Sequence, residues 1–358
     1  MCISGKINVP RNLLNLKLML EGGQSFRWKR IEENLWVGVA SKIFWKLRQY
    51  DDRLEYMAMS NSKLDQSFCK KFITAYLRLD EDLSALYGKW SEADENFRKV
   101  AEKWPGLRIL DQDPVENLFS FICSSNNNIS RISSMVEKMC KFYGEKVAES
   151  DGVSYYSFPP IESLAGDTVE SDLRTAGFGY RAKYIHKSAT QLVELGGREW
   201  LTELKRVDYK EAKDKLVRLQ GIGPKVADCI CLMSLGHLQA VPVDTHVFQI
   251  AQRYLPHLRQ VKTCTPRIYS DITNYFQELY GPYSGWAHTI LFCDDLKMFK
   301  DKSDESKMKI APADSEVKIK IETDEKGEKT VGSKGAAKRA VSDNSNVRNQ
   351  KMKTRRKK

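Results

Sequence analysis

Recognisable cysteine patterns are absent from this sequence: its eight cysteines form no Cys-x-x-Cys pair and no evenly spaced framework. This absence argues against a zinc ribbon and a disulfide scaffold, and it favours reduced thiols in the nucleus or cytosol. No apolar run approaches the length that spans a membrane, and no secretory signal is visible. We therefore expect a nuclear protein. A mitochondrial address stays open because the first twenty residues lack acidic groups, although a first strand or helix explains their apolar run as well.

Excess charge is also scarce over most of the chain. The formal net charge is +11, but residues 301–358 hold 17 basic and 10 acidic residues and therefore +7 of it. Contacts with a nucleic acid must then come from one local face of a mildly basic body. Residues 301–358 also lack aromatic residues and cysteine, so we expect a disordered basic tail. Its end is typical of a nuclear-import signal, a loose DNA-binding tail or a solubilising segment.

Short β-branched and aromatic runs separated by polar turns fill residues 13 to about 60. They predict strands in an antiparallel meander. The clearest runs are 35–40, 43–48 and 54–59.

Helical spacing of apolar residues begins at Leu64 and continues through most of the chain to residue 300. Asp113-Pro114 is typical of a helix start, with an N-cap followed by proline at the first helical position. The length allows two domains. We predict an α+β protein with a β-rich domain over 1–110 and a helical domain over 111–300.

One short segment combines several groups with chemical potential. Gly221-Ile222-Gly223 forms a hairpin pattern, and Pro224 follows it at the start of an apolar helical run. Such a turn aims free backbone N–H groups outward from a helix N-terminus, which favours a phosphate. Lys225 comes next, and Asp244 follows in Val-Pro-Val-Asp-Thr-His. An amine, a carboxylate and a phosphate cradle together suggest chemistry on a nucleic acid.

The Leu-x-Gly-Ile-Gly-x-Lys…Val-Pro-Val-Asp pattern resembles the helix-hairpin-helix, Gly/Pro-Asp superfamily of DNA glycosylases. Within it, the sequence is similar to the eukaryotic 8-oxoguanine DNA glycosylase/AP lyases, from about Leu13 to about Leu296. Three further blocks carry the narrower resemblance: Gly-Gly-Gln-Ser-Phe-Arg-Trp at 22–28, Phe-Ile-Cys-Ser-Ser-Asn-Asn-Asn-Ile at 121–129 and Gly-Pro-Tyr-Ser-Gly-Trp-Ala at 281–287.

The resemblance implies a β-domain packed on a helical bundle, with the active site at their junction. It implies a monomer that acts on double-stranded DNA containing oxidised guanine, flips out the lesion opposite cytosine, and nicks the abasic site. Relatives with an iron–sulfur cluster hold it by closely spaced C-terminal cysteines. Only Cys264 and Cys293 follow the Asp244 motif here, so we expect no cluster, no cofactor and no catalytic metal. A structural cation on the hairpin carbonyls stays open.

Lys225 is the candidate nucleophile, since an amine can attack the sugar, expel the base and leave a Schiff base. It must first be neutral, and we expect the helix dipole and desolvation to lower its pKa. The alternative is a surface lysine that binds phosphate. Asp244 is the candidate electrostatic and acid–base partner, a role compatible with the simpler interpretation of a helix N-cap.

Base recognition is predicted from glycine geometry and from the resemblance. Only glycine lets a backbone carbonyl approach N7 of the lesion without obstruction, and Gly23 matches that position. Cys229 lies one helical turn after Lys225, and the resemblance places the base between this cysteine and Phe292. We expect Pro242 to line the same pocket. Turn formation for Gly23 and ordinary core packing for the others remain alternatives.

His288 departs from the family, in which most relatives have glutamine. A neutral histidine offers one donor and one acceptor, whereas glutamine offers a carbonyl and two donors. We predict that His288 still contacts the base, with weaker or pH-dependent selectivity.

Contacts with the rest of the DNA are implied mainly by the resemblance. Arginine and asparagine suit hydrogen bonding to the estranged cytosine, and an inserted tyrosine offsets lost stacking. We expect Asn126, Arg131 and Arg181 to contact the cytosine. We expect Tyr180 to insert its ring into the gap left by the flipped base. We expect phosphate contacts from Gly221, Gly223 and His246. Leu173-Arg-Thr-Ala-Gly-Phe-Gly-Tyr-Arg-Ala repeats the hairpin pattern, but an ordinary glycine-capped helix turn explains it equally well. Asparagine runs also occur as plain helix caps.

The sequence therefore predicts a bifunctional 8-oxoguanine DNA glycosylase with lyase activity. One alternative is a glycosylase for alkylated purines, which would commonly keep the aspartate but lack the lysine. The other is a catalytically silent helix-hairpin-helix module that binds DNA without turnover.

Overall fold

The computed structural model describes residues 2–296, so the tail predicted for 301–358 lies outside the described residues. Five antiparallel strands form the N-terminal sheet in the order β1-β5-β4-β3-β2. The strands are β1 (Cys2–Asn8), β2 (Trp28–Glu32), β3 (Leu35–Ala40), β4 (Ile43–Gln49) and β5 (Arg53–Met59). The predicted meander is confirmed as β3, β4 and β5, which pair consecutively.

Two elements near the N-terminus differ from the sequence-based expectation. The run around Leu16 is not a strand but the helix α1 (Leu16–Glu21), which Asn15 caps by accepting a hydrogen bond from the Leu18 N–H. Strand β1 has no long apolar run, and it forms because it pairs with β5 some fifty residues later, as in Cys2 with Met59. Neighbouring sequence does not reveal such a long-range partner.

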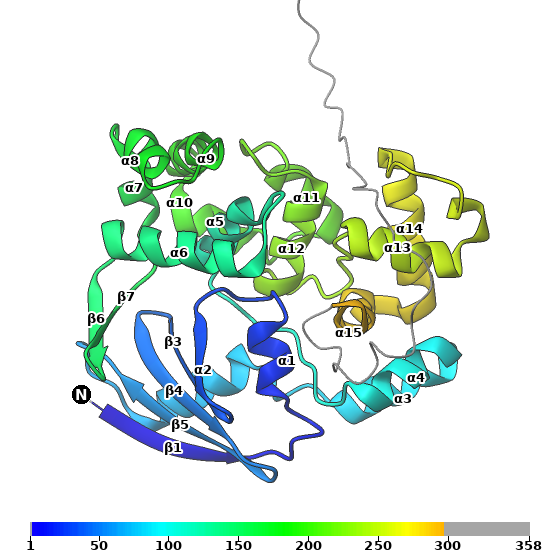
Figure 1. The fold of residues 1–358 in the computed structure, drawn as a ribbon, viewed down its shortest axis with the longest axis horizontal. Coiled ribbons are helices and arrows are strands. Elements are labelled where there is room, and N and C mark those ends of the chain that lie inside the picture. The colour runs from blue at the N-terminus through cyan, green and yellow to red at the C-terminus, as the bar shows by residue number, and fades with distance from the viewer. Residues whose placement is uncertain (1, 297–358) are drawn as a thin grey trace, which may run out of the picture. The chain divides into compact units, whose positions relative to one another are not determined.

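The remaining chain is mostly helical, as predicted (Figure 1). The helices are α2 (Gln66–Tyr76), α3 (Leu83–Ala93), α4 (Glu95–Lys103), α5 (Pro114–Ser124), α6 (Ile129–Tyr143), α7 (Ile161–Leu164), α8 (Val169–Thr175), α9 (Arg181–Leu195), α10 (Gly197–Glu203), α11 (Tyr209–Leu216), α12 (Pro224–Ser234), α13 (Thr245–Tyr254), α14 (Pro266–Tyr280) and α15 (Ser284–Asp295), with the 3-10 turns η1 (Pro256–Leu258) and η2 (Gly281–Tyr283). A hairpin of β6 (Lys146–Ser150) and β7 (Val153–Tyr156) interrupts the helices and was not predicted. No helix among residues 2–296 has the length and apolar character needed to cross a membrane.

Helix α5 begins as predicted at Asp113-Pro114. The Asp113 carboxylate accepts hydrogen bonds from the N–H groups of Val115 and Glu116, at 3.0 and 3.1 Å. This cap satisfies two of the donors that an α-helix leaves free at its start. Nearly every residue of α5 is buried, which makes it a central helix of the fold.

The buried side chains form two large cores. One lies between the sheet, α1 and α2, and the other fills the helical part. Helices α3 and α4 belong to the helical core through side chains such as Trp90 and Phe97, although they precede the predicted domain boundary at residue 110. That boundary stays a prediction.

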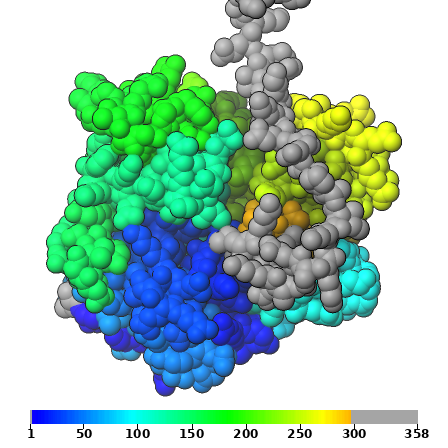
Figure 2. All heavy atoms as spheres, viewed as in Figure 1, coloured from blue at the N-terminus to red at the C-terminus, as the bar shows by residue number. Residues whose placement is uncertain are grey.

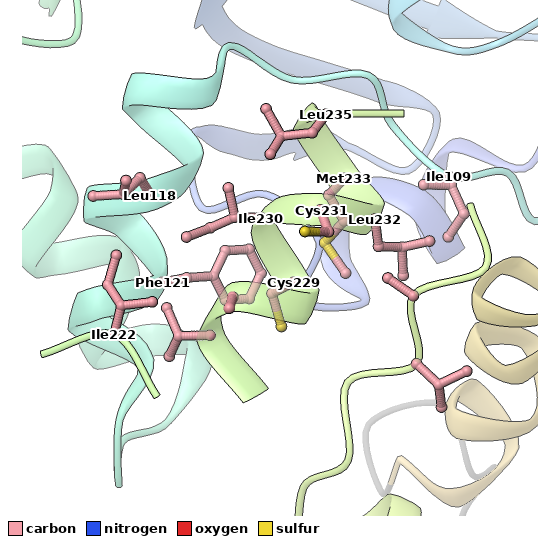
Figure 3. Close-up of a cluster of buried hydrophobic side chains, with 14 of the residues drawn as sticks. Ile109, Leu118, Phe121, Ile222, Cys229, Ile230, Cys231, Leu232, Met233 and Leu235 are labelled. Atoms are coloured by element: carbon pink, nitrogen blue, oxygen red, sulfur yellow. The ribbon is translucent and has the colours of Figure 1, made fainter. Parts of the chain in front are cut away.

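The two cores meet where the N-terminal segment packs against the helices, and Figure 2 shows the blue N-terminal residues in direct contact with the green helical part. The ring of Phe26 lies edge-on against Phe121 of α5, with 5.6 Å between centroids. Figure 3 shows Phe121 and Leu118 facing α12, from which Cys229, Ile230 and Met233 project. Helix α12 therefore lies at the centre of the fold and carries its residues to the junction.

Candidate active site

The hairpin predicted between two helices joins α11 to α12. Gly221 has a φ of +85°, and a Cβ at this position would lie 2.6 Å from the Tyr184 side chain on α9. Both facts require glycine there. Gly223 is different: its backbone is extended, nothing lies within 4 Å of its would-be Cβ, and it caps α12 without a side chain. A positive φ therefore occurs at Gly221 and not at Gly223, whose open side leaves the start of α12 accessible.

Lys225 lies in the first turn of α12, half-buried, with its ammonium group 5.3 Å above the centre of the Phe121 ring. Burial lowers the pKa of Lys225, whereas Cys229 and the Asp244 carboxylate raise it. The two raising effects together are larger than the effect of burial, so the net direction of the pKa shift is upward. The prediction of a lowered Lys225 pKa is therefore wrong for this state. The reason is that Cys229, one helical turn along α12, and the Asp244 carboxylate together outweigh the effect of burial.

Asp244 is the N-cap of α13, and its carboxylate accepts a hydrogen bond from the Val247 N–H at 3.0 Å. The simpler interpretation of Asp244 is thus confirmed. The cap fixes the carboxylate in one orientation at a helix start, where partial positive charge favours an anion. The Asp244 carboxylate also lines the same cavity as Lys225.

The glycine pair before β2 forms a tight turn after α1. Gly23 has a φ of +83°, which non-glycine residues rarely adopt. A Cβ at Gly22 would lie 2.3 Å from the Leu18 carbonyl oxygen, so this glycine is required as well. Gln24 is buried, and its side-chain amide makes two hydrogen bonds with the segment before α5. Its NH₂ group donates to the Arg108 carbonyl, and its oxygen accepts from the Leu110 N–H. These bonds hold the turn against the helical part.

His288 projects from α15 and is only 2% exposed. Burial lowers its pKa from 6.5 to about 4, with Asp244 acting in the opposite direction. The imidazole is consequently neutral between pH 6 and 8, and the effect of His288 on selectivity stays a prediction. Among the described residues, the Nε2 atom of His288 has no hydrogen-bond partner.

A cavity of about 70 Å³ collects residues from four separate parts of the sequence. It brings together all the residues predicted as catalytic or base-binding: Gly23, Lys225, Cys229, Pro242, Asp244, His288 and Phe292. Cys229 is a neutral thiol, because burial raises its pKa to about 11. The cavity is well below the roughly 300 Å³ of pockets that bind drug-sized ligands.

The cavity also has lining residues that the sequence-based predictions missed. These are Gly22, Gln24, Phe121, Met233, Val247 and Thr289. Met233 could have been found, since it continues the four-residue spacing of Lys225 and Cys229 along α12. Phe121 and Gln24 lie in the motif blocks at 121–129 and 22–28, but their place in the cavity depends on how the N-terminal segment packs against α5.

The predicted cytosine contacts lie away from this cavity. Asn126 is exposed, with a φ of +48°, whereas the helix cap of α6 is Asn128, which accepts from the Arg131 N–H at 3.0 Å. The structure thus separates Asn126 from the plain capping role. Arg131 is exposed and donates to the Gly177 carbonyl at 3.4 Å.

The second glycine hairpin lies between α8 and α9. Gly177 and Gly179 both have positive φ, and Tyr180 at its tip is 46% exposed. Arg181 is only 3% exposed, and its guanidinium donates to the carbonyls of Ser125 and Asn126. In this state Arg181 therefore supports the Asn126 backbone and does not face solvent.

His246 is partly exposed at the start of α13. Its Nδ1 lies 3.2 Å from the Asp295 carboxylate, which also accepts from Arg253 at 3.0 Å. The imidazole contacts the Phe292 ring edge-on, with 5.8 Å between centroids. His246 thus lies beside the cavity, with Phe292 between them.

The described residues contain no group of three or more His, Cys, Asp or Glu side chains arranged to hold a metal ion. The expectation that no metal or cofactor is needed stays a prediction.

Comparison with known proteins gives two family matches. Residues 6–118 match the family described as "8-oxoguanine DNA glycosylase, N-terminal domain", and residues 119–269 match the "HhH-GPD superfamily base excision DNA repair protein" family. The chain is 39% identical over 288 residues to the N-glycosylase/DNA lyase OGG1 of Arabidopsis thaliana, covering 79% of this chain and 78% of that protein. It is 35% identical over 326 residues to the N-glycosylase/DNA lyase of Saccharomyces cerevisiae, covering 82% and 86%.

A solved structure is similar over nearly the same length. It is the Clostridium acetobutylicum 8-oxoguanine glycosylase/lyase in complex with double-stranded DNA containing cytosine opposite to 8-oxoguanine. It is 27% identical, with a TM-score of 0.70, and the match covers 82% of this chain and 97% of that one.

Proposed function

We infer the function of this chain from its family, because the chain belongs to the 8-oxoguanine DNA glycosylases of the HhH-GPD superfamily. It is a base excision repair enzyme that removes 8-oxoguanine from DNA and cleaves the resulting abasic site. The predicted family, fold class and enzyme class are confirmed. The two alternatives, an alkylpurine glycosylase and a silent DNA-binding module, are not favoured. The relatives matched over about four-fifths of the chain are N-glycosylase/DNA lyases.

Lys225 is the nucleophile of this proposal, and Asp244 is its partner. The observation that carries the assignment is that both line one cavity with Gly23, Cys229 and Phe292. The Lys225 nitrogen forms a bond to C1′ of the sugar while the bond from C1′ to the base breaks. The base leaves with that electron pair and a proton.

The next steps follow from the imine. Opening of the sugar ring gives a Schiff base between Lys225 and C1′. The imine makes the neighbouring C2′ proton acidic, and its loss expels the 3′ phosphate by β-elimination.

Because the Lys225 pKa is raised in the free enzyme, the ammonium group must lose a proton before it attacks. Asp244 receives this proton and passes it to the departing base, and its charge stabilises the developing positive charge on the sugar.

Recognition of the lesion is assigned to the glycine turn and to α15. The Gly23 carbonyl accepts a hydrogen bond from the protonated N7 of 8-oxoguanine and repels the lone pair on N7 of guanine. The base lies between Cys229 and Phe292. His288 contacts its Watson–Crick edge as a neutral imidazole, with the Nε2 atom that lacks a partner among the described residues. Pro242 completes the pocket.

Contacts with the duplex follow the same reasoning. Asn126, Arg131 and Arg181 bind the estranged cytosine, and Tyr180 fills the gap left by the flipped base. Gly221, Gly223 and His246 contact phosphates near the lesion. Cytosine as the opposite base is supported by the Clostridium acetobutylicum relative, whose complex contains that pair.

We also propose that the protein acts as a monomer in the nucleus. All eight cysteines lie within the described residues, and none forms a disulfide. This pattern suits a reducing compartment.

Borohydride trapping tests the assignment of Lys225. The native protein should excise 8-oxoguanine from a duplex opposite cytosine and become covalently linked to the DNA when borohydride reduces the Schiff base. Lys225→Gln should do neither. Lys215→Gln is a matched control, because Lys215 lies near the hairpin on α11, paired with Glu211 at 2.6 Å and outside the cavity, and it should behave as the native protein. Cross-linking by Lys225→Gln would overturn the assignment, and absence of excision by the native protein would overturn the function.

A further inference from the structure

A buried carboxylate lies on α12 only three residues after Lys225. Asp228 is completely buried and is surrounded by three donors from two other helices. It accepts hydrogen bonds from the Tyr209 hydroxyl at 2.6 Å and the Lys213 ammonium at 2.8 Å, both on α11, and from the Tyr269 hydroxyl of α14 at 2.5 Å. The mechanism above uses none of these four side chains.

The Tyr269 hydroxyl has a second partner, and this partner is next to the active site. It accepts a hydrogen bond at 3.2 Å from the N–H of Val243, the residue directly before Asp244. The hydroxyl therefore links the loop that carries Asp244 to Asp228, which shares α12 with Lys225. Tyr269 is buried, so water does not readily replace this bond.

We propose that Tyr269, held by Asp228, is a positioning residue that sets the Asp244 carboxylate relative to the Lys225 amine. The inference rests on the proposed function of Lys225 and Asp244. Val243 donates to the tyrosine, and the tyrosine donates to an anion, so the two hydrogen bonds polarise each other in the same direction. An isolated buried charge is costly unless it is paired, and Lys213 supplies the pairing.

Such a link matters because the two reacting groups sit on different segments. Lys225 is fixed by α12, whereas Asp244 follows a loop between α12 and α13. A misplacement of about 1 Å can slow an enzymatic reaction by roughly a hundredfold. A smaller displacement of the loop should therefore slow excision by about tenfold and leave DNA binding unaffected.

The chain provides a matched control for this test. Tyr209 donates to the same carboxylate as Tyr269, at a similar distance, but it lies on α11 and its hydroxyl contacts Asp228 and Lys213. Tyr209→Phe and Tyr269→Phe each remove one hydroxyl and one hydrogen bond to Asp228. Of the two, Tyr269→Phe alone also releases the Val243 N–H. The difference between the two variants thus isolates the link to the loop.

Single-turnover excision of 8-oxoguanine opposite cytosine is the measurement, with full-length protein in excess over DNA. We expect Tyr269→Phe to be slower than the native protein by about tenfold and Tyr209→Phe to be within about twofold of it. Affinity for a duplex with a non-cleavable tetrahydrofuran abasic analogue should be unchanged in both. Thermal midpoints measured alongside separate a change in rate from loss of fold. Equal rates for the two variants, or weaker binding in place of slower excision, would overturn the proposal.

A second variant keeps the test decisive if Tyr269→Phe does not fold. Asp228→Asn preserves side-chain volume but removes the anion that orients the Tyr269 hydroxyl, so it should also slow excision more than Tyr209→Phe. A rate for Asp228→Asn equal to that of Tyr209→Phe would overturn the proposal. If the native protein excises no lesion at all, the proposed function has failed and not the positioning role.

Discussion

Replacing His288 by glutamine should make the stability of this protein less sensitive to acid. The imidazole is buried, and burial lowers its pKa from 6.5 to about 4. Above pH 6.5 the side chain is neutral in both the folded and the unfolded chain. Below it, the unfolded chain takes up a proton that the folded chain does not, so the free energy of unfolding falls as the pH falls from 6.5 towards 4. Glutamine does not titrate and removes this contribution.

The size of the effect follows from the shift in pKa. One pKa unit corresponds to about 1.4 kcal/mol, so complete titration of His288 costs the folded state about 3 kcal/mol. At about pH 5 this titration lowers the free energy of unfolding by about 2 kcal/mol, and near pH 7.5 it lowers it by almost nothing. Contributions from other buried groups, such as Glu116, whose pKa is raised to about 7 by burial, are common to both proteins and cancel in the difference.

Urea denaturation at about pH 7.5 and about pH 5 measures this difference. The free energy of unfolding of His288→Gln, relative to the native protein, should rise by about 2 kcal/mol between the two conditions. His257→Gln is the matched control, because His257 is exposed, and its difference should stay constant. A change of less than about 0.5 kcal/mol for His288→Gln would mean that His288 is not buried as a neutral ring.

Three substitutions of glycine test the turns at the active site. Gly23→Ala forces a non-glycine residue to a φ of +83°, so it should lower the free energy of unfolding by about 1–2 kcal/mol and reduce the preference for 8-oxoguanine over guanine in single-turnover assays. Unchanged preference would exclude the Gly23 carbonyl as the N7 acceptor. Gly221→Ala adds a clash with Tyr184 to its strained φ and should lower the thermal midpoint. Gly223→Ala meets no atom within 4 Å and should leave the midpoint unchanged while weakening affinity for duplex DNA, and equal midpoints for the Gly221 and Gly223 variants would contradict this account of the hairpin.

The sequence alone determined the features that depend on near neighbours. Three such features agree with the structure. The cap and proline at Asp113-Pro114 start α5, the β-branched and aromatic runs between Leu35 and Met59 form strands, and the glycine at 221 forms a turn. The four motif blocks also identified the family, because each block preserves residue types in a fixed order. Strand β1 escaped prediction because its partner β5 lies far away in the sequence.

Only the tertiary structure decided the charge states and supports of the candidate site. The raised pKa of Lys225 depends on Cys229 and on Asp244, of which only the fold brings Asp244 close, and the neutral state of His288 depends on its burial. Likewise, Tyr269 of α14 reaches both Asp228 of α12 and the Val243 N–H only because the fold brings these three segments together. Electrostatic energies and hydrogen bonds depend on distance in space and on exclusion of water, and neither quantity is encoded in the spacing of residues along the chain.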